Sequence, residues 1–250
     1  MMGYRIIPPV PGLGAGGGGP SGTVTIAAVG TSATSGGAGT YTVAINVPSG
    51  TKKLLVCAGS TMFSTPVEAA TSVVWDVATA NEALSLVASS RSIQEIDANN
   101  HNVVEWWQKN NPTAGNLLVT ITKPNATCEC YGQAFAMDIT GGSAIALRTP
   151  VILDNNSDSI SQSVTTAVNE IVLSVVVIID GDGTPQDVGY AAPDNTDRGE
   201  AWIGNQVGSY FGSSSEAGAG SSVSKGWTYT GTVHESLPGS AISSIAVQPA

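Results

Sequence analysis

Apolar and polar residues alternate over short runs throughout residues 23–250, and the clearest runs lie between residues 72 and 122. Side chains alternate between the two faces of a β-strand, so a period of two predicts strands with one buried face. The pattern predicts four strands here, over residues 72–75, 83–89, 102–108 and 117–122. In the second run Leu84 and Leu86 fall on one face and Val87 on the other. Asn-Asn, Asn-Pro and Ala-Gly pairs between the runs are typical of turns.

Similar runs precede and follow this stretch. They predict strands over residues 23–29, 40–47, 53–59, 128–139, 144–150, 159–167, 171–179, 200–206, 227–234 and 242–248. The turn Pro48-Ser49-Gly50 indicates that 40–47 and 53–59 form a hairpin. The order of polar run, turn and apolar run recurs at 159–179, about 120 residues later. It reflects either an internal duplication or two hairpins of one sandwich, and we favour the second interpretation.

The number of predicted strands and the composition together indicate an all-β fold. Only 11% of the 250 residues are charged, and there are 30 glycines and many β-branched residues. At least ten strands must protect their edges, which two packed sheets achieve. We therefore expect a jelly-roll β-sandwich of two antiparallel sheets, formed by residues 23–250 as a single domain.

Residues 1–22 are rich in glycine and proline, which do not pack a core of their own. This tract is either a disordered tail or an extended N-terminal arm that lies on a partner subunit. We favour the arm, because a pure spacer needs no apolar side chains. The apolar side chains that would contact the partner are Tyr4, Ile6, Ile7, Val10 and Leu13.

The charge and hydropathy of the chain exclude some classes of partner. The formal net charge is −10, and the nine basic residues are scattered, so the chain lacks the basic footprint that binds nucleic acid. No apolar run reaches the ~18–20 residues of a membrane span, and Pro8, Pro9 and Pro11 interrupt the start of the chain. We expect synthesis and folding in a cytoplasm.

Three cysteines, Cys57, Cys128 and Cys130, are an odd number for a disulfide framework. Cys128 and Cys130 alone lack the other ligands of a zinc site. We expect buried, reduced thiols that act as small apolar residues.

Several short motifs occur along the predicted strands and turns: Val74-Trp75-Asp76, Ala83-Leu84, Glu105-Trp106-Trp107, Asn111-Pro112, Ala114-Gly115 and the closing stretch 245–250, IAVQPA. Together they resemble the motifs of β-sandwich domains in phage and prophage virion proteins. The likeness covers roughly residues 24–250. It implies a β-sandwich fold and a place in a virion.

The sequence offers little for catalysis. No Gly-x-Ser-x-Gly elbow, His-Glu-x-x-His helix or phosphate-binding loop occurs. Paired carboxylates would suit a polysaccharide-degrading enzyme, and the candidates are Glu95, Asp97, Glu105 and Asp138. We predict that the protein is not an enzyme, with no catalytic residues and no cofactor.

One loop has the composition of a calcium site. Asp180, Asp182 and Asp187 could supply oxygen ligands from a single segment. Asp-Gly is also an ordinary signal of a tight turn, so this segment is a hypothesis for calcium and not a recognised motif.

The five tryptophans divide between core and surface. Trp75 and Trp227 lie in apolar runs and are predicted to be core. Trp106 and Trp107 are adjacent, so in a strand one should point inward and the other outward. We assign Trp106, Trp107 and Trp202 to a partner interface, where aromatic residues are enriched, with sugar stacking as the alternative.

These observations lead to one functional hypothesis and one alternative. We expect a non-enzymatic phage structural protein, a capsid decoration (cement) protein on the virion surface. It would dock on the major capsid protein or another virion protein through the N-terminal arm, as a homo-oligomer and most plausibly a trimer. The alternative is a glycan-binding module of a tail fibre or surface adhesin. A sandwich fold alone does not separate them.

Overall fold

The computed structural model describes residues 21–31, 33–36, 39–62, 69–77, 80–95, 101–123, 129–155, 159–179, 188–190, 196–203, 209–229 and 239–250. Within these ranges the chain forms strands and turns and no helix. The all-β expectation is confirmed.

The described strands fall into a first and a second half of the chain. The first half contains β1 (Thr23–Val29), β2 (Ala33–Gly36), β3 (Thr40–Val47), β4 (Lys53–Met62), β5 (Ser72–Val77), β6 (Ala80–Ala83), β7 (Ser85–Leu86), β8 (Ser92–Glu95), β9 (His101–Asn110), β10 (Gly115–Thr122) and β11 (Glu129–Thr140). The second half contains β12 (Ile145–Leu147), β13 (Val151–Asn155), β14 (Ser159–Thr165), β15 (Ile171–Ile179), β16 (Val188–Tyr190), β17 (Thr196–Ile203), β18 (Ser209–Ala217), β19 (Ser222–Tyr229) and β20 (Gly239–Pro249).

These strands form four antiparallel sheets, and no sheet mixes strands of the two halves. The first large sheet has the order β1-β11-β4-β9-β7, with β2 also paired to β11 and β8 to β9. The first small sheet has the order β3-β10-β5-β6. The second large sheet has the order β12-β20-β15-β18-β17, with β13 also paired to β20, and the second small sheet has the order β14-β19-β16. The sequence predicted two sheets, and this number is wrong, because the described strands form four.

The two halves share one arrangement of strands. Each large sheet is centred on a long strand, β4 or β15, which lies between the last strand of its half (β11 or β20) and the strand β9 or β18. Each small sheet contains the order β3-β10-β5 or its counterpart β14-β19-β16. Along the chain, both halves alternate between small and large sheet in the same sequence of steps.

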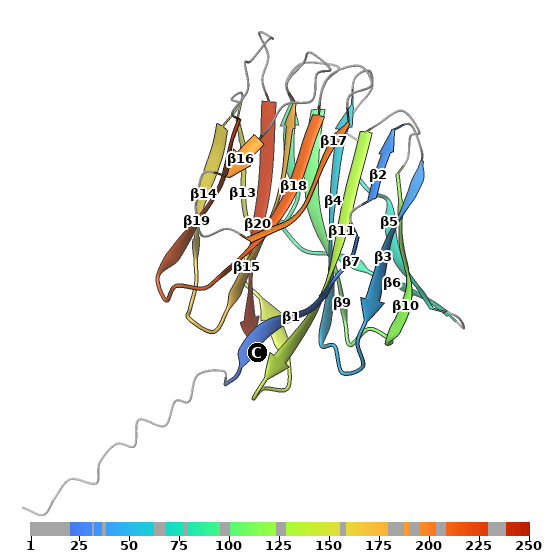
Figure 1. Cartoon of the computed structure of the whole chain (residues 1–250), viewed down its shortest axis with the longest axis vertical. Helices are drawn as coiled ribbons and strands as arrows, with labels where there is room; N and C mark the ends of the chain where they lie inside the picture. The colour runs from blue at the N-terminus through green and yellow to red at the C-terminus, as the bar shows by residue number, and fades with distance from the viewer. Residues whose placement is uncertain are drawn as a thin grey trace, which may run out of the picture.

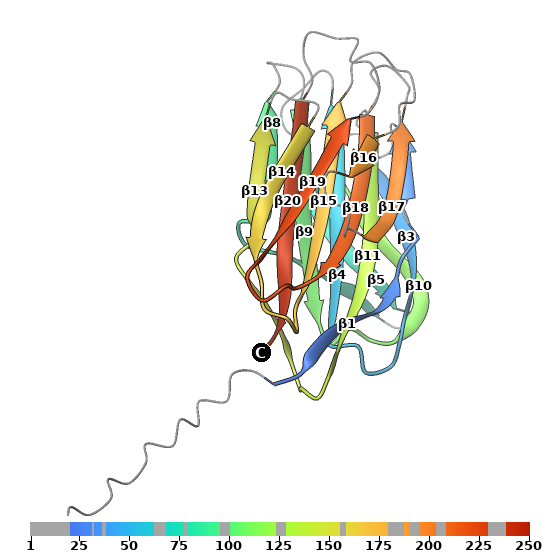
Figure 2. The same cartoon turned by 60° about the vertical axis from the view of Figure 1, so that its left-hand side comes forward.

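Figure 1 shows the sheets as successive layers, with the two large sheets in the middle and a small sheet on each outer side. Figure 2 shows that the strands run along the long axis of the molecule and that β1 crosses its lower end. The middle core lies between the two large sheets and includes Leu55, Phe135, Val175, Phe211 and Ile245. This shared core joins the two halves.

The hairpin expected around Pro48-Ser49-Gly50 is not found. The turn itself forms, with Thr51 N donating to Pro48 O at 3.3 Å. However, β3 pairs with β10, and β4 pairs with β11 and β9. The reason is burial: β3 has alternating exposed and buried residues, whereas a large sheet is covered on both faces and β4 is buried along both. The turn therefore connects two sheets.

The strand expected over residues 83–89 is also wrong, because the chain changes sheet within it. β6 pairs with β5 in the first small sheet, and β7 pairs with β9 in the first large sheet. At the crossing, Leu84 N donates to Val73 O at 2.9 Å, and Val87 N donates to Trp106 O at 2.8 Å. Leu84 and Val87 are buried and Leu86 is exposed, which breaks the alternation read from the sequence.

Candidate functional site

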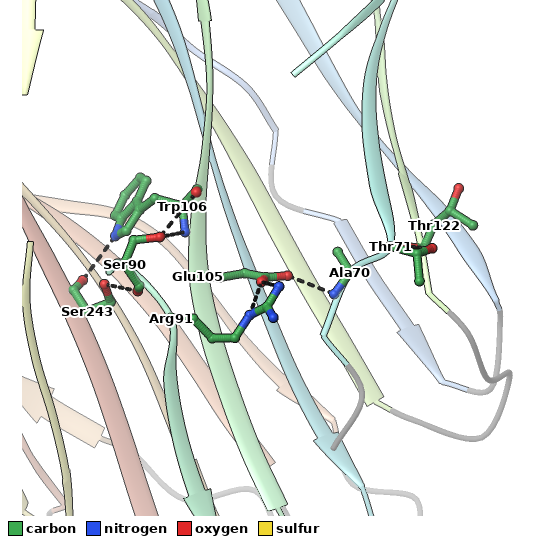
Figure 3. A network of polar contacts seen from close by, with 8 residues as sticks. All are labelled: Ala70, Thr71, Ser90, Arg91, Glu105, Trp106, Thr122 and Ser243. Carbon is green, nitrogen blue, oxygen red and sulfur yellow. Dashed lines mark hydrogen bonds and ion pairs between the residues drawn. The ribbon is translucent and has the colours of Figure 1, made fainter. Parts of the chain in front are cut away.

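A network of polar contacts runs through the first half around Glu105, a carboxylate that is 1% exposed on β9 (Figure 3). Arg91, in the connection between β7 and β8, donates from Nε to Glu105 Oε2 at 2.8 Å and places Nη2 2.7 Å from the same oxygen. Ala70 N, just before β5, donates to the other oxygen, Oε1, at 2.7 Å. Both carboxylate oxygens are thus engaged, which offsets the cost of burying the charge.

The next residue of β9, Trp106, extends the network in the opposite direction. Its backbone N donates to Ser90 Oγ at 3.1 Å, and its indole Nε1 donates to Ser243 O of β20 at 3.2 Å. Ser243 Oγ in turn donates to Ser90 O at 2.6 Å. Figure 3 shows Ser90 and Ser243 on one side of β9 and Arg91 and Ala70 towards the other. These contacts tie the first half to the second.

At its far end, the network reaches the first small sheet. Thr71 follows Ala70, and its N and Oγ1 both donate to Thr122 O of β10, at 2.8 and 3.1 Å. The contacts around Glu105 and Trp106 therefore connect three of the four sheets. The arrangement fixes these sheets relative to one another, and its polar groups form hydrogen bonds with other members of the network.

The other carboxylates proposed for a glycosidase pair do not join Glu105. Glu95 is exposed on β8 and lies opposite His101 of β9, four residues from Glu105, which corresponds to about 13 Å along a strand. Glycosidase carboxylates lie about 5–10 Å apart. Asp138 lies on β11, where its Oδ1 accepts a hydrogen bond from Ile139 N, and Asp97 lies outside the described residues.

A groove of ≈ 440 Å³ lies where β1 passes beside β17 and β18 of the second large sheet. Val24, Thr25 and Ile26 of β1 form one wall, and β17 and β18 form the other. Arg198 lies in this groove and donates from Nε to Ser215 Oγ at 2.7 Å. The groove is partly apolar and partly polar.

A smaller groove of ≈ 290 Å³ lies at the corresponding place in the first half. Leu147, at the end of β12, and Arg148 form part of it, together with Val87 and Gln108. β12 holds the position in its sheet that β1 holds in the other, and β9 corresponds to β18. The two grooves therefore repeat the internal symmetry of the fold. Arg148 is paired with Glu170, with Nε 2.9 Å from Oε2.

The four tryptophans whose side chains the structure describes are buried. Trp106 and Trp107 are both buried, because β9 is covered on both faces: Trp106 packs in the core between the large sheets and Trp107 in the core of the first half. The expectation that one of them points outward is wrong, and neither ring is available on the surface. Trp75 and Trp227 are buried, as expected. Trp202 lies in β17, and its side chain is outside the described part.

The remaining predicted site residues lie largely outside the described ranges. This applies to the calcium candidates Asp180, Asp182 and Asp187, and to the arm residues Tyr4, Ile6, Ile7, Val10 and Leu13. Among the described residues, no group of three or more His, Cys, Asp or Glu side chains is placed to hold a metal ion.

The cysteine expectation is confirmed for the two thiols that are described. Cys57 and Cys130 are both buried. Burial raises the pKa of the Cys57 thiol to about 12. A thiol with so high a pKa remains protonated near neutral pH and is a poor nucleophile or metal ligand.

The sequence patterns did not indicate the buried polar side chains that form hydrogen bonds between the sheets. Tyr131 OH donates to Gly199 O at 3.0 Å, and Gln133 Nε2 donates to Gly30 O at 3.3 Å and to Arg198 O. Ser213 Oγ donates to Gln133 Oε1. The available signal was the presence of serine and glutamine inside otherwise apolar strands, where a polar group needs an internal partner.

Comparisons with protein-family models, with curated proteins and with solved structures gave no match to this chain. In the described residues, no helix has the length and apolar character needed to cross a membrane.

Proposed function

We propose that this chain is a non-enzymatic structural protein of a phage virion, built from jelly-roll β-sandwiches. The observation that carries the proposal is the strand order. The orders β1-β11-β4-β9 and β3-β10-β5-β6, in two facing sheets, support the proposal that these eight strands are wound as a jelly roll. The second half follows the same order over most of its strands. Jelly rolls are a common fold of viral capsid domains, so this order supports the virion assignment suggested by the sequence motifs.

The polar network supports a structural task over a catalytic one. Glu105 binds Arg91 and Ala70, and Trp106 binds Ser243, so these side chains form hydrogen bonds within the fold that help to connect three sheets. A site for chemistry instead needs groups that are held in place and left open to a substrate. Bracing of this kind suits a protein that must keep its shape on a particle.

Within the virion, we propose a capsid decoration protein that docks through residues 1–22. The chain enters the fold at β1, which crosses one end of the molecule (Figure 2). An anchor attached there would hold the molecule by that end and leave the outer faces of both small sheets clear. Repeated weak contacts over many copies would provide the binding strength, with the chain as a trimer.

Binding to particles tests this proposal. The full chain and a form that begins at Thr23 would each be mixed with particles that lack the protein, sedimented and quantified, with their free masses measured by light scattering. We expect both forms to share one oligomeric mass and only the full chain to sediment. If neither form sediments with particles, the decoration role is wrong.

A further inference from the structure

The core of the second half is interrupted by a layer of polar side chains. At the centre of the second large sheet, Ser174 of β15 lies opposite Ser214 and Ser244 on its two neighbours. The same places in the first half, counted from the start of the central strand, hold Val56, Trp107 and Ala134, which are apolar. As a result, the second half has two separate apolar clusters, one around Trp227 and one around Val223.

Lys225 of β19 lies in this polar layer and is fully buried. Its Nζ lies 3.4 Å from Glu216 Oε2 of β18, in the facing sheet. Burial lowers the pKa of Lys225 to about 8, because the charged amine is poorly solvated there. Roughly a tenth of this amine is therefore neutral, and nucleophilic, at pH 7, compared with well under a hundredth for an ordinary lysine.

Gln162 of β14 lies directly opposite Lys225 in the second small sheet. The inward pairs of these two strands are Ile160 with Trp227, Gln162 with Lys225, and Val164 with Val223. Directly opposed residues have their Cβ atoms about 5 Å apart, a distance that an extended lysine side chain exceeds.

The carboxamide of Gln162 is held in place by its nitrogen. Nε2 donates to Val151 O at 3.0 Å and to Ser244 Oγ at 2.6 Å. The carbonyl oxygen, Oε1, is buried and has no hydrogen-bond partner among the residues that the structure describes. Lys225 thus faces Gln162 across the strand pair and forms an ion pair with Glu216 of the facing sheet.

We propose that Lys225 and Gln162 form an intramolecular isopeptide bond. Nζ of Lys225 attacks Cδ of Gln162, a new C–N bond forms, the bond from Cδ to Nε2 breaks, and ammonia leaves. The proton that Nζ loses passes to Glu216 and from Glu216 to the departing nitrogen. One amide replaces another, so the reaction needs no oxidant, metal or cofactor.

A second buried lysine provides an internal comparison. Lys53 Nζ donates to Gln108 Oε1 at 2.9 Å and to Asn110 Oδ1, so it also contacts carboxamides. Within the described part of the chain, no ion pair joins Lys53 to a carboxylate. Because proton transfer through a carboxylate is part of the reaction, we expect no bond at Lys53.

The test is the mass of the purified full chain under denaturing conditions, followed by tryptic peptide mapping. We expect a mass lower by one ammonia, a branched peptide that joins Gln162 to Lys225, and no tryptic cleavage after Lys225. The Gln162→Leu, Lys225→Met and Glu216→Gln variants should each have the full mass calculated from their sequences. The Lys53→Met variant should be lighter than its calculated mass by one ammonia, as the wild-type chain is. In refolded protein, the rate of bond formation should rise with pH until the pH passes about 8, the pKa of Lys225.

Two outcomes would overturn the proposal. One is a wild-type chain that retains its full mass after prolonged incubation in the folded state at about pH 9, where most of the Lys225 amine is neutral. The other is a Gln162→Leu variant that still loses ammonia, which would place the bond elsewhere. The measurement on the wild-type chain does not depend on any variant folding.

Discussion

Glu105 is a charged residue whose surroundings assign it a structural role. Its two oxygens accept hydrogen bonds from Ala70 N and from the guanidinium of Arg91, and its side chain is buried in the first half. A buried carboxylate is tolerated when such partners replace water. Loss of the charge on Glu105 should therefore destabilise the fold, because Arg91 is paired with it.

We expect Glu105→Gln to lower the free energy of unfolding by about 1–3 kcal/mol, because Arg91 would lose its ionic partner. Urea denaturation measures this effect. Glu95→Gln is the matched control: Glu95 is exposed on β8, so its change should stay within about 0.5 kcal/mol. Equal stability of the two variants would contradict the bracing role.

Cys57 and Cys130 should not react with thiol reagents in the folded protein. Both are buried, and the pKa of Cys57 is raised to about 12, so little thiolate exists at pH 8. In a Cys128→Ser background, a colorimetric thiol assay should detect no thiol before denaturation and both thiols after it. Rapid labelling of the native protein would show that the described cores are more open than the structure indicates.

At the scale of elements, the crossing between β6 and β7 is where the chain moves from a small to a large sheet. Leu84 is buried at this crossing (6% exposed), whereas Leu86, two residues later, is 36% exposed. A continuous strand would have placed both on one face. Because the chain changes sheet between them, Leu84 is buried and Leu86 is exposed.

Alanine substitution should therefore separate the two leucines. Leu84→Ala is expected to lower the free energy of unfolding by about 2–4 kcal/mol, because it leaves a cavity in the core of the first half. Leu86→Ala should cost less than about 1 kcal/mol, since its side chain is partly in water. Equal costs, measured by thermal or urea unfolding, would instead support one unbroken strand.

Most strands could be predicted from the sequence, but their sheets could not. Alternation located β3 and β10, and the continuous apolar run located β15. The pairing of β3 with β10 joins residues far apart in the chain, and local turn chemistry favoured the nearer partner, β4. The burial of Glu105 could not be predicted either, because its partners Arg91 and Ala70 lie on other segments of the chain.

At the scale of the whole molecule, the two halves are built alike and meet through their large sheets. The middle core takes residues from equivalent strands, such as Leu55 of β4 and Leu173 of β15. Each half would expose this apolar face if it were alone. The halves should therefore depend on each other.

Cutting the chain between Gly142 and Ser143 tests this dependence. The cut lies in the connection between β11 and β12, and none of the described strands pairs across it. We expect the two fragments to copurify in a 1:1 complex when expressed together, and each alone to aggregate or self-associate. Two stable monomeric fragments without mutual affinity would contradict the shared core.

The copy number of the chain in purified particles tests the proposed function most directly. Particles from the source of the chain would be banded by density, washed and analysed by quantitative mass spectrometry against their most abundant coat protein. The account predicts that the chain stays with the band in many copies, at a fixed ratio to that coat protein. A chain found only in the unassembled fraction, or at less than one copy per particle, would contradict it.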